Sequence, residues 1–249
     1  LDRWGLSPAQ RAAAEAALRF LAAPPGEGRK SSRPEGQWPR ARELFWRSML
    51  RRQNAGAAAT HGSTLAGNGQ SSPKPGEPAW GIASRCLPDS AAERFLLWAV
   101  TGAGKTEMMF PLLQHVLEHG GTALVATPRR DVVLELAPRL AVAFPQVSMV
   151  TLYGGSAERW QRGQLTLATT HQLLRYRQAF DLVVIDEIDA FPFHNDPMLA
   201  FAARAVCKRE GKFIYLSATP PRPLQKEAAR GQLPHAKVPV RFHRHPLPV

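Results

Sequence analysis

The sequence predicts an α/β fold in which helices flank a mostly parallel central sheet, and three observations support this prediction. From about residue 92 onward, short apolar runs alternate with helical patterns, which is typical of a parallel sheet. One apolar run leads directly into a glycine-rich turn that ends in Lys105-Thr106, and another leads into Asp186-Glu187-Ile188-Asp189. Because such sheets bind ligands at the carboxyl ends of their strands, polar residues at those ends are the candidate site residues.

The first expected element is a helix that starts at Pro8. Ser7 is suited to the N-cap, Pro8 to the first helical position, and the alanine-rich segment 11–21 to the helix interior. Segment 24–91 is rich in Gly, Pro, Ser and Arg and has no sustained period, so it predicts a long, largely flexible insertion. This insertion is either a surface linker or a basic arm that contacts nucleic acid or a partner.

The remaining elements follow in alternation. We expect strands at 95–100, 122–127, 147–152, 165–169, 182–186 and 212–217, because these short apolar runs alternate with helical patterns. We expect helices at 105–118, 131–144, 170–176 and 197–209.

Composition narrows the class of protein. The chain has 249 residues, 44% of them hydrophobic, which is enough for a full core. No apolar run approaches the roughly 18 residues that cross a bilayer and no secretory leader is evident, so we expect a cytoplasmic protein. Cys86 and Cys207 provide neither a disulfide framework nor a zinc set. A formal net charge of +12 indicates an anionic partner such as nucleic acid.

The turn Thr101-Gly102-Ala103-Gly104-Lys105-Thr106 predicts a loop that binds the phosphates of ATP. Gly102 and Gly104 let successive backbone N–H groups approach the phosphates, Lys105 reaches the β and γ phosphates, and Thr106 holds Mg²⁺. Ala99 stands where the usual pattern has its first glycine. The alternative is therefore a tight strand-to-helix turn with an incidental lysine.

The acidic stretch after the apolar run 182–185 predicts the second half of this site. Asp186 would hold Mg²⁺, and Glu187 would polarise the water that attacks the γ phosphate. With Lys105, Glu187 is the expected catalytic residue. The alternative is an acidic turn that N-caps the next helix.

A third strand ends in Ser217-Ala218-Thr219, and with it the chain resembles superfamily II helicases of the DEAD/DEAH type. In that group this triplet couples hydrolysis to nucleic-acid movement, and its hydroxyls contact acidic residues of the preceding motif. Leu6-Ser7-Pro8-Ala9-Gln10 resembles the adenine-reading Gln motif, which adds Gln10 to the expected nucleotide contacts. Three further segments resemble the motifs that grip the nucleic-acid backbone, and the contacts they imply are Thr127, Pro128, Arg129, Gly154, Gly155, Thr169 and Thr170.

The whole set is similar to the ComFA family, the late-competence DNA-uptake helicases of bacteria. The resemblance covers residues 1–23 and about 92–249 and implies a RecA-like P-loop NTPase lobe at 92–249, to which the Gln-motif helix at 1–23 belongs. A complete member has a second RecA-like lobe whose arginines complete the ATP site, and no such motif occurs before Val249. The chain also starts at Leu1, so we expect a fragment of a two-lobed motor that is nearly inactive alone.

The function implied is ATP-dependent translocation on single-stranded DNA, with ATP and Mg²⁺ as cofactors. The resemblance implies that the motor serves the uptake of transforming DNA with competence machinery at the inner face of the membrane. Three alternatives stay open at this point. They are a replication-restart helicase of the primosomal type, a phosphotransferase that uses the same loop, and a non-catalytic fragment that binds nucleotide or nucleic acid.

Overall fold

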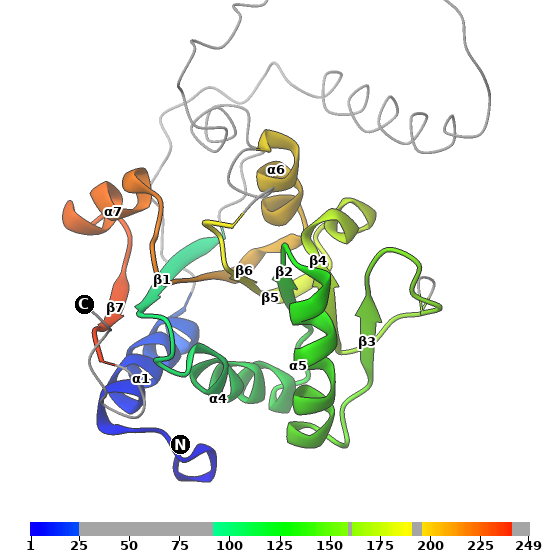
Figure 1. Cartoon of the computed structure of the whole chain (residues 1–249), viewed down its shortest axis with the longest axis horizontal. Coiled ribbons are helices and arrows are strands. Elements are labelled where there is room, and N and C mark those ends of the chain that lie inside the picture. Colours follow the sequence, from blue (N-terminus) through cyan, green and yellow to red (C-terminus); the bar gives the residue numbers. More distant parts are fainter. Residues whose placement is uncertain (25–91, 159–160, 191–195, 241–249) are drawn as a thin grey trace, which may run out of the picture. The chain divides into compact units, whose positions relative to one another are not determined.

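The computed structural model describes residues 1–24, 92–158, 161–190 and 196–240 (Figure 1). All of these residues belong to one compact unit. Of the insertion predicted at 24–91, residues 25–91 lie outside the described residues, as do 159–160, Phe191–Asn195 and the tail 241–249.

The centre of this unit is a seven-stranded sheet in which every neighbouring pair of strands is parallel. The strands are β1 (Glu93–Ala99), β2 (Ala123–Thr127), β3 (Met149–Leu152), β4 (Leu165–Thr169), β5 (Phe180–Asp186), β6 (Cys207–Ser217) and β7 (His235–Val238). Their order across the sheet is β3-β4-β2-β5-β6-β1-β7. The predicted fold class, an α/β lobe with a parallel central sheet flanked by helices, is confirmed. All carboxyl ends lie along one edge, called here the carboxyl edge.

Helices cover both faces of the sheet (Figure 1). Alternate strand residues such as Leu97, Val125 and Val184 pack in one core cluster with α1 (Pro8–Ala22), α4 (Lys105–Glu118) and α5 (Arg130–Ala143). The intervening residues, such as Leu124 and Val183, pack with the opposite layer. That layer contains the 3₁₀ helix η2 (Thr170–Arg175), α6 (Pro197–Ala205) and α7 (Arg222–Ala229). The apolar runs are continuous because both faces of each strand are buried.

The prediction of a helix over 197–209 is wrong at its end. Helix α6 ends at Ala205, and Cys207 already pairs with Phe180 of β5. The pairing is interrupted after Cys207 by a bulge, and Gly211 allows the chain to return to the sheet. A side chain there would place its Cβ 2.7 Å from the Cys207 sulfur and 2.9 Å from the Asp181 carbonyl oxygen.

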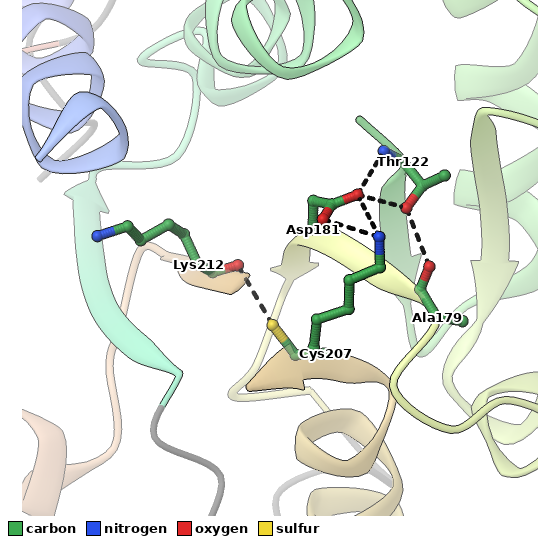
Figure 2. Close-up of polar contacts among 6 residues, drawn as sticks. Thr122, Ala179, Asp181, Cys207 and Lys212 are labelled. Carbon is green, nitrogen blue, oxygen red and sulfur yellow. Dashed lines mark hydrogen bonds and ion pairs between the residues drawn. The ribbon is translucent and has the colours of Figure 1, made fainter. Parts of the chain in front are cut away.

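A polar network fixes the amino ends of the strands at this bulge (Figure 2). One oxygen of Asp181 accepts hydrogen bonds from the Thr122 N–H at 2.9 Å and from its hydroxyl at 2.8 Å. The ammonium of Lys208 contacts both Asp181 oxygens at 2.8 Å. Burial raises the pKa of Cys207 to about 12, so this thiol packs in the interior and is not reactive. The network lies at the opposite end of the strands from the carboxyl edge.

Candidate nucleotide and nucleic-acid site

Strand β1 delivers the phosphate loop, residues 101–106, to the carboxyl edge. The loop turns tightly, because the Ala103 N–H donates to the Val100 carbonyl at 3.0 Å. Gly102 and Gly104 have φ of 77° and 72°, backbone angles that side chains disfavour. Gly104 is the N-cap of α4 and has no side chain that could cap the helix. The N–H groups of the first turn of α4 therefore point toward the place where an anion would bind.

Gln10 of α1 is wedged against this loop and is only 1% exposed. Its Oε1 accepts a hydrogen bond from the Ser7 N–H at 2.7 Å, which completes a capping box. Its Nε2 donates to the Ala103 carbonyl at 2.8 Å. Both ends of the amide thus contact the protein itself, and the expected contact between Gln10 and adenine stays a prediction. The hydrogen bond to Ala103 ties the phosphate loop to α1 through Gln10.

Asp186 ends β5 at the carboxyl edge and is 8% exposed. Burial raises its pKa to about 6, and the charge of Lys105 acts in the opposite direction. The charge of Lys105 therefore acts on the carboxylate at the end of β5. Asp186 Oδ1 accepts a hydrogen bond from the Glu187 N–H at 2.9 Å. A divalent cation would supply the positive charge that this buried carboxylate lacks, and oxygen ligands such as Asp186 and Thr106 suit Mg²⁺.

Glu187 has an unusual backbone. Its φ is 54°, in the left-handed region, where a residue with a side chain is strained. Its Oε2 is buried and has no hydrogen-bond partner among the described residues. A strained residue with an unsatisfied carboxylate oxygen is typical of a functional position.

The triplet begins with Ser217, the last residue of β6, and continues with Ala218 and Thr219; β6 is the strand between β5 and β1. The Ser217 hydroxyl donates to Asp189 Oδ1 at 2.7 Å, and the Thr219 hydroxyl donates to Asp189 Oδ2. Burial tends to raise the pKa of Asp189, but these two hydrogen bonds outweigh it and the pKa is lowered. The family resemblance implied a contact with an acidic residue, and the structure identifies that residue as Asp189, which sequence reasoning had not singled out.

The expected nucleic-acid contacts lie at the carboxyl ends of β2, β3 and β4, which form the other half of the sheet. Four of these residues are buried: Thr127, Pro128, Thr169 and Thr170. Side-chain contacts from these four to a nucleic acid are therefore not available in this conformation. The exposed members are Arg129, Gly154 and Gly155. The surface they offer consists of one guanidinium and an exposed backbone turn.

Arg129 forms an ion pair with Asp131 at 2.5 Å, and both side chains are exposed. The hydrogen bond from Arg129 lowers the pKa of Asp131, and Glu187 adds to the negative charge that Arg129 senses. The neighbouring Arg130 lies 4.7 Å from the centre of the Tyr153 ring, which joins α5 to the turn after β3. Arg129 thus belongs to the half of the sheet formed by β2, β3 and β4, called here the nucleic-acid half, and its charge interacts with Glu187 of the acidic turn.

Comparison with known proteins adds a family and close relatives. Residues 82–226 match the family model of the DEAD/DEAH box helicase. The chain is 50% identical over 159 residues to competence protein ComFA of Bacillus subtilis, and this match covers 64% of the chain and 34% of the relative. It is 45% identical over 152 residues to competence protein ComFA of Streptococcus pneumoniae, covering 61% of the chain and 35% of that protein. The matched part of this chain thus spans about a third of the length of these relatives.

Solved structures are more distant. A hypothetical ATP-dependent RNA helicase from Sulfolobus tokodaii is 22% identical, with a TM-score of 0.47, over 63% of this chain and 52% of that chain. A DEAD box protein from Methanococcus jannaschii is 20% identical, with a TM-score of 0.44, over 59% and 45% of the two chains. Within the part of the chain that the structure describes, no helix is long and apolar enough to cross a membrane.

Proposed function

Since the chain belongs to the DEAD/DEAH box helicase family, we propose that it is the ATP-binding lobe of a motor that translocates on single-stranded DNA. The observation that carries this proposal is the placement of the phosphate loop, the acidic turn and the triplet on β1, β5 and β6. In the sheet, β6 lies between β5 and β1 and neighbours both of them. An ATP site and its coupling element thereby share one part of the carboxyl edge.

The chemical roles follow from this placement. Lys105 and the N-terminus of α4 bind the phosphates, and Thr106 and Asp186 hold the Mg²⁺ that accompanies ATP. The metal neutralises the charge of the phosphates when ATP is bound. Glu187 orients the attacking water and accepts its proton. The Oε2 of Glu187 supports this role, because it is a carboxylate oxygen whose hydrogen-bonding capacity no described residue uses.

The nucleic-acid half supports a partner that is held by its backbone. The exposed groups there, Arg129 and the turn at Gly154-Gly155, can contact phosphates and sugars but offer little to read base edges. A formal net charge of +12 agrees with such a partner. Because the relatives are named competence proteins, we propose that the DNA is transforming DNA and that the motor acts with the uptake machinery. Its second RecA-like lobe would complete the ATP site.

ATP turnover by the full-length protein, measured with and without single-stranded DNA, tests this proposal. Glu187→Gln should lower the turnover rate by about 10²–10⁴ and leave ATP affinity within a few fold, because the amide cannot accept the proton of the water. Glu15→Gln is the matched control, since Glu15 is an exposed glutamate on α1. It should leave turnover unchanged.

Two results would contradict the proposal. Wild-type turnover in Glu187→Gln would show that Glu187 is not the base. Turnover that does not respond to single-stranded DNA would point to a nucleotide hydrolase that is not a DNA motor.

A further inference from the structure

Trp98 is the residue of β1 that lies between the coupling triplet and the edge strand β7. In the sheet register, Trp98 is opposite Ser217 of β6 on one side and Lys237 of β7 on the other. Its side chain is partly buried and packs against the core cluster on the face of α6 and α7. Trp98 also lies three positions before Thr101, the first residue of the phosphate loop.

The indole of Trp98 makes a directed contact with the triplet. Its Nε1–H donates a hydrogen bond to the carbonyl oxygen of Ala218 at 3.2 Å. Ala218 is the middle residue of the triplet and lies just beyond the end of β6, so the regular ladder of the sheet does not continue there. The two neighbours of Ala218 are the residues whose hydroxyls hold Asp189. The indole thus fixes the backbone on which both hydroxyls depend.

The ring of Trp98 also contacts a cation from β7. The ammonium of Lys237 lies 4.4 Å from the centre of the Trp98 ring. A cation over an indole is attracted by the electrons of the ring, which limits rotation of the side chain. Lys237 is itself exposed, so its substitution does not disturb the core.

We propose that Trp98 is a positioning residue that holds the Ser217-Ala218-Thr219 triplet in register with the phosphate loop, and so transmits the state of the nucleotide to the nucleic-acid half. This inference rests on the proposed function. A displacement of the loop moves the end of β1 and therefore the indole. The indole in turn moves the Ala218 carbonyl and, with it, the hydroxyls bound to Asp189.

Trp98→Phe tests the proposal, because it removes the indole N–H and keeps an aromatic ring. The matched control is Trp4→Phe. The Trp4 indole also donates a hydrogen bond, to Gln114 Oε1 at 2.9 Å, and also lies against a cation, Arg3 at 4.8 Å. Trp4 is remote from the triplet in these contacts, so the control loses the same kind of bond without touching the coupling element.

The first measurement is amide hydrogen exchange of a peptide covering 216–220, without nucleotide. We expect exchange about five- to tenfold faster in Trp98→Phe and unchanged in Trp4→Phe, the factor that loss of one hydrogen bond implies. With the non-hydrolysable analogue AMP-PNP and Mg²⁺, the peptide should respond in the wild-type protein and in Trp4→Phe but not in Trp98→Phe. Unchanged exchange in Trp98→Phe would overturn the proposal.

The second measurement is the ratio of turnover with single-stranded DNA to turnover without it, in the full-length protein. Trp98→Phe should lower this ratio about five- to tenfold while the Michaelis constant for ATP stays within twofold. An equal loss in Trp4→Phe would show a merely structural role. Absence of stimulation in the wild type would instead contradict the proposed function, and the exchange measurement would still decide the role of Trp98. If Trp98→Phe does not fold, Lys237→Met should accelerate exchange about two- to threefold, and no change would overturn the proposal.

Discussion

Gly104→Ala should harm the phosphate loop in two separable ways. The first is the backbone, because φ at Gly104 is 72° and alanine disfavours that region. The second is Gln10, whose Nε2 would lie 2.2 Å from the new Cβ. The Gln10 side chain is flexible and can swing away. It would then lose its hydrogen bonds to Ala103 and Ser7 in a place where water has little access.

The size of each effect can be estimated. Left-handed backbone costs alanine about 1–2 kcal/mol relative to glycine. Disruption of the buried Gln10 contacts adds about 1–3 kcal/mol, because the amide and the Ala103 carbonyl lose their partners. The free energy of unfolding should therefore fall by roughly 2–5 kcal/mol.

Gly120→Ala is the control that isolates the second effect. Gly120 has a φ of 74°, and a Cβ there would meet nothing within 4 Å. Urea denaturation of the wild type and both variants, without nucleotide, gives the difference directly. A loss for Gly104→Ala within about 0.5 kcal/mol of the loss for Gly120→Ala would refute the idea that Gln10 positions the loop. Most of the excess loss should also disappear when Gln10→Ala is the background, since only the contact of the new Cβ with Glu107 Oε2 at 3.0 Å then remains.

Two further predictions concern charge. Asp131→Asn should strengthen binding to a single-stranded oligonucleotide severalfold, because it releases Arg129 from its exposed ion pair. Arg129→Ala should weaken binding and reduce the salt dependence of the affinity. Fluorescence anisotropy titrations at several salt concentrations measure both effects, and equal affinities in all three proteins would contradict the role of Arg129 in binding. Without nucleotide and Mg²⁺, the folded state holds the Asp186 proton up to a pKa of about 6, above its ordinary value of 3.8, so the free energy of unfolding should fall as pH rises from about 4 to 6. Asp186→Asn should remove this loss, about 3 kcal/mol at pH 7.5, and a pH profile of unfolding that is the same in both proteins would contradict the raised pKa.

The sequence predicted the site best where neighbouring residues alone determine the backbone of a motif. The apolar run before Asp186 predicts a buried strand, and the strand necessarily delivers its last residue to the carboxyl edge. The glycines of the phosphate loop predict the positive φ angles found at Gly102 and Gly104. Parallel strands then bring the two motifs to the same edge of the sheet, and the strand order places them one strand apart.

The sequence was least informative where distant contacts decide. Gln10 lies 93 positions from Ala103, and no local pattern shows that its amide contacts the loop. Helix α7 and strand β7 were missed because Pro221 and Pro223 interrupt the helical pattern and because a four-residue edge strand has almost no periodicity. Thr127 matches a contact motif, yet it is fully buried, because burial depends on how the neighbouring elements pack.

The left-handed backbone of Glu187 implies that its proposed role in hydrolysis reduces the thermal stability of the fold. A chain selected only for stability would carry glycine or asparagine at this position, since either residue tolerates a φ of 54° better than glutamate does. On the proposed function, the carboxylate at this position serves hydrolysis, yet its backbone costs folding free energy in every molecule, whether or not ATP is present. Laboratory evolution for heat resistance alone should therefore favour substitution at Glu187 and yield more stable proteins that lack the proposed ATP hydrolysis.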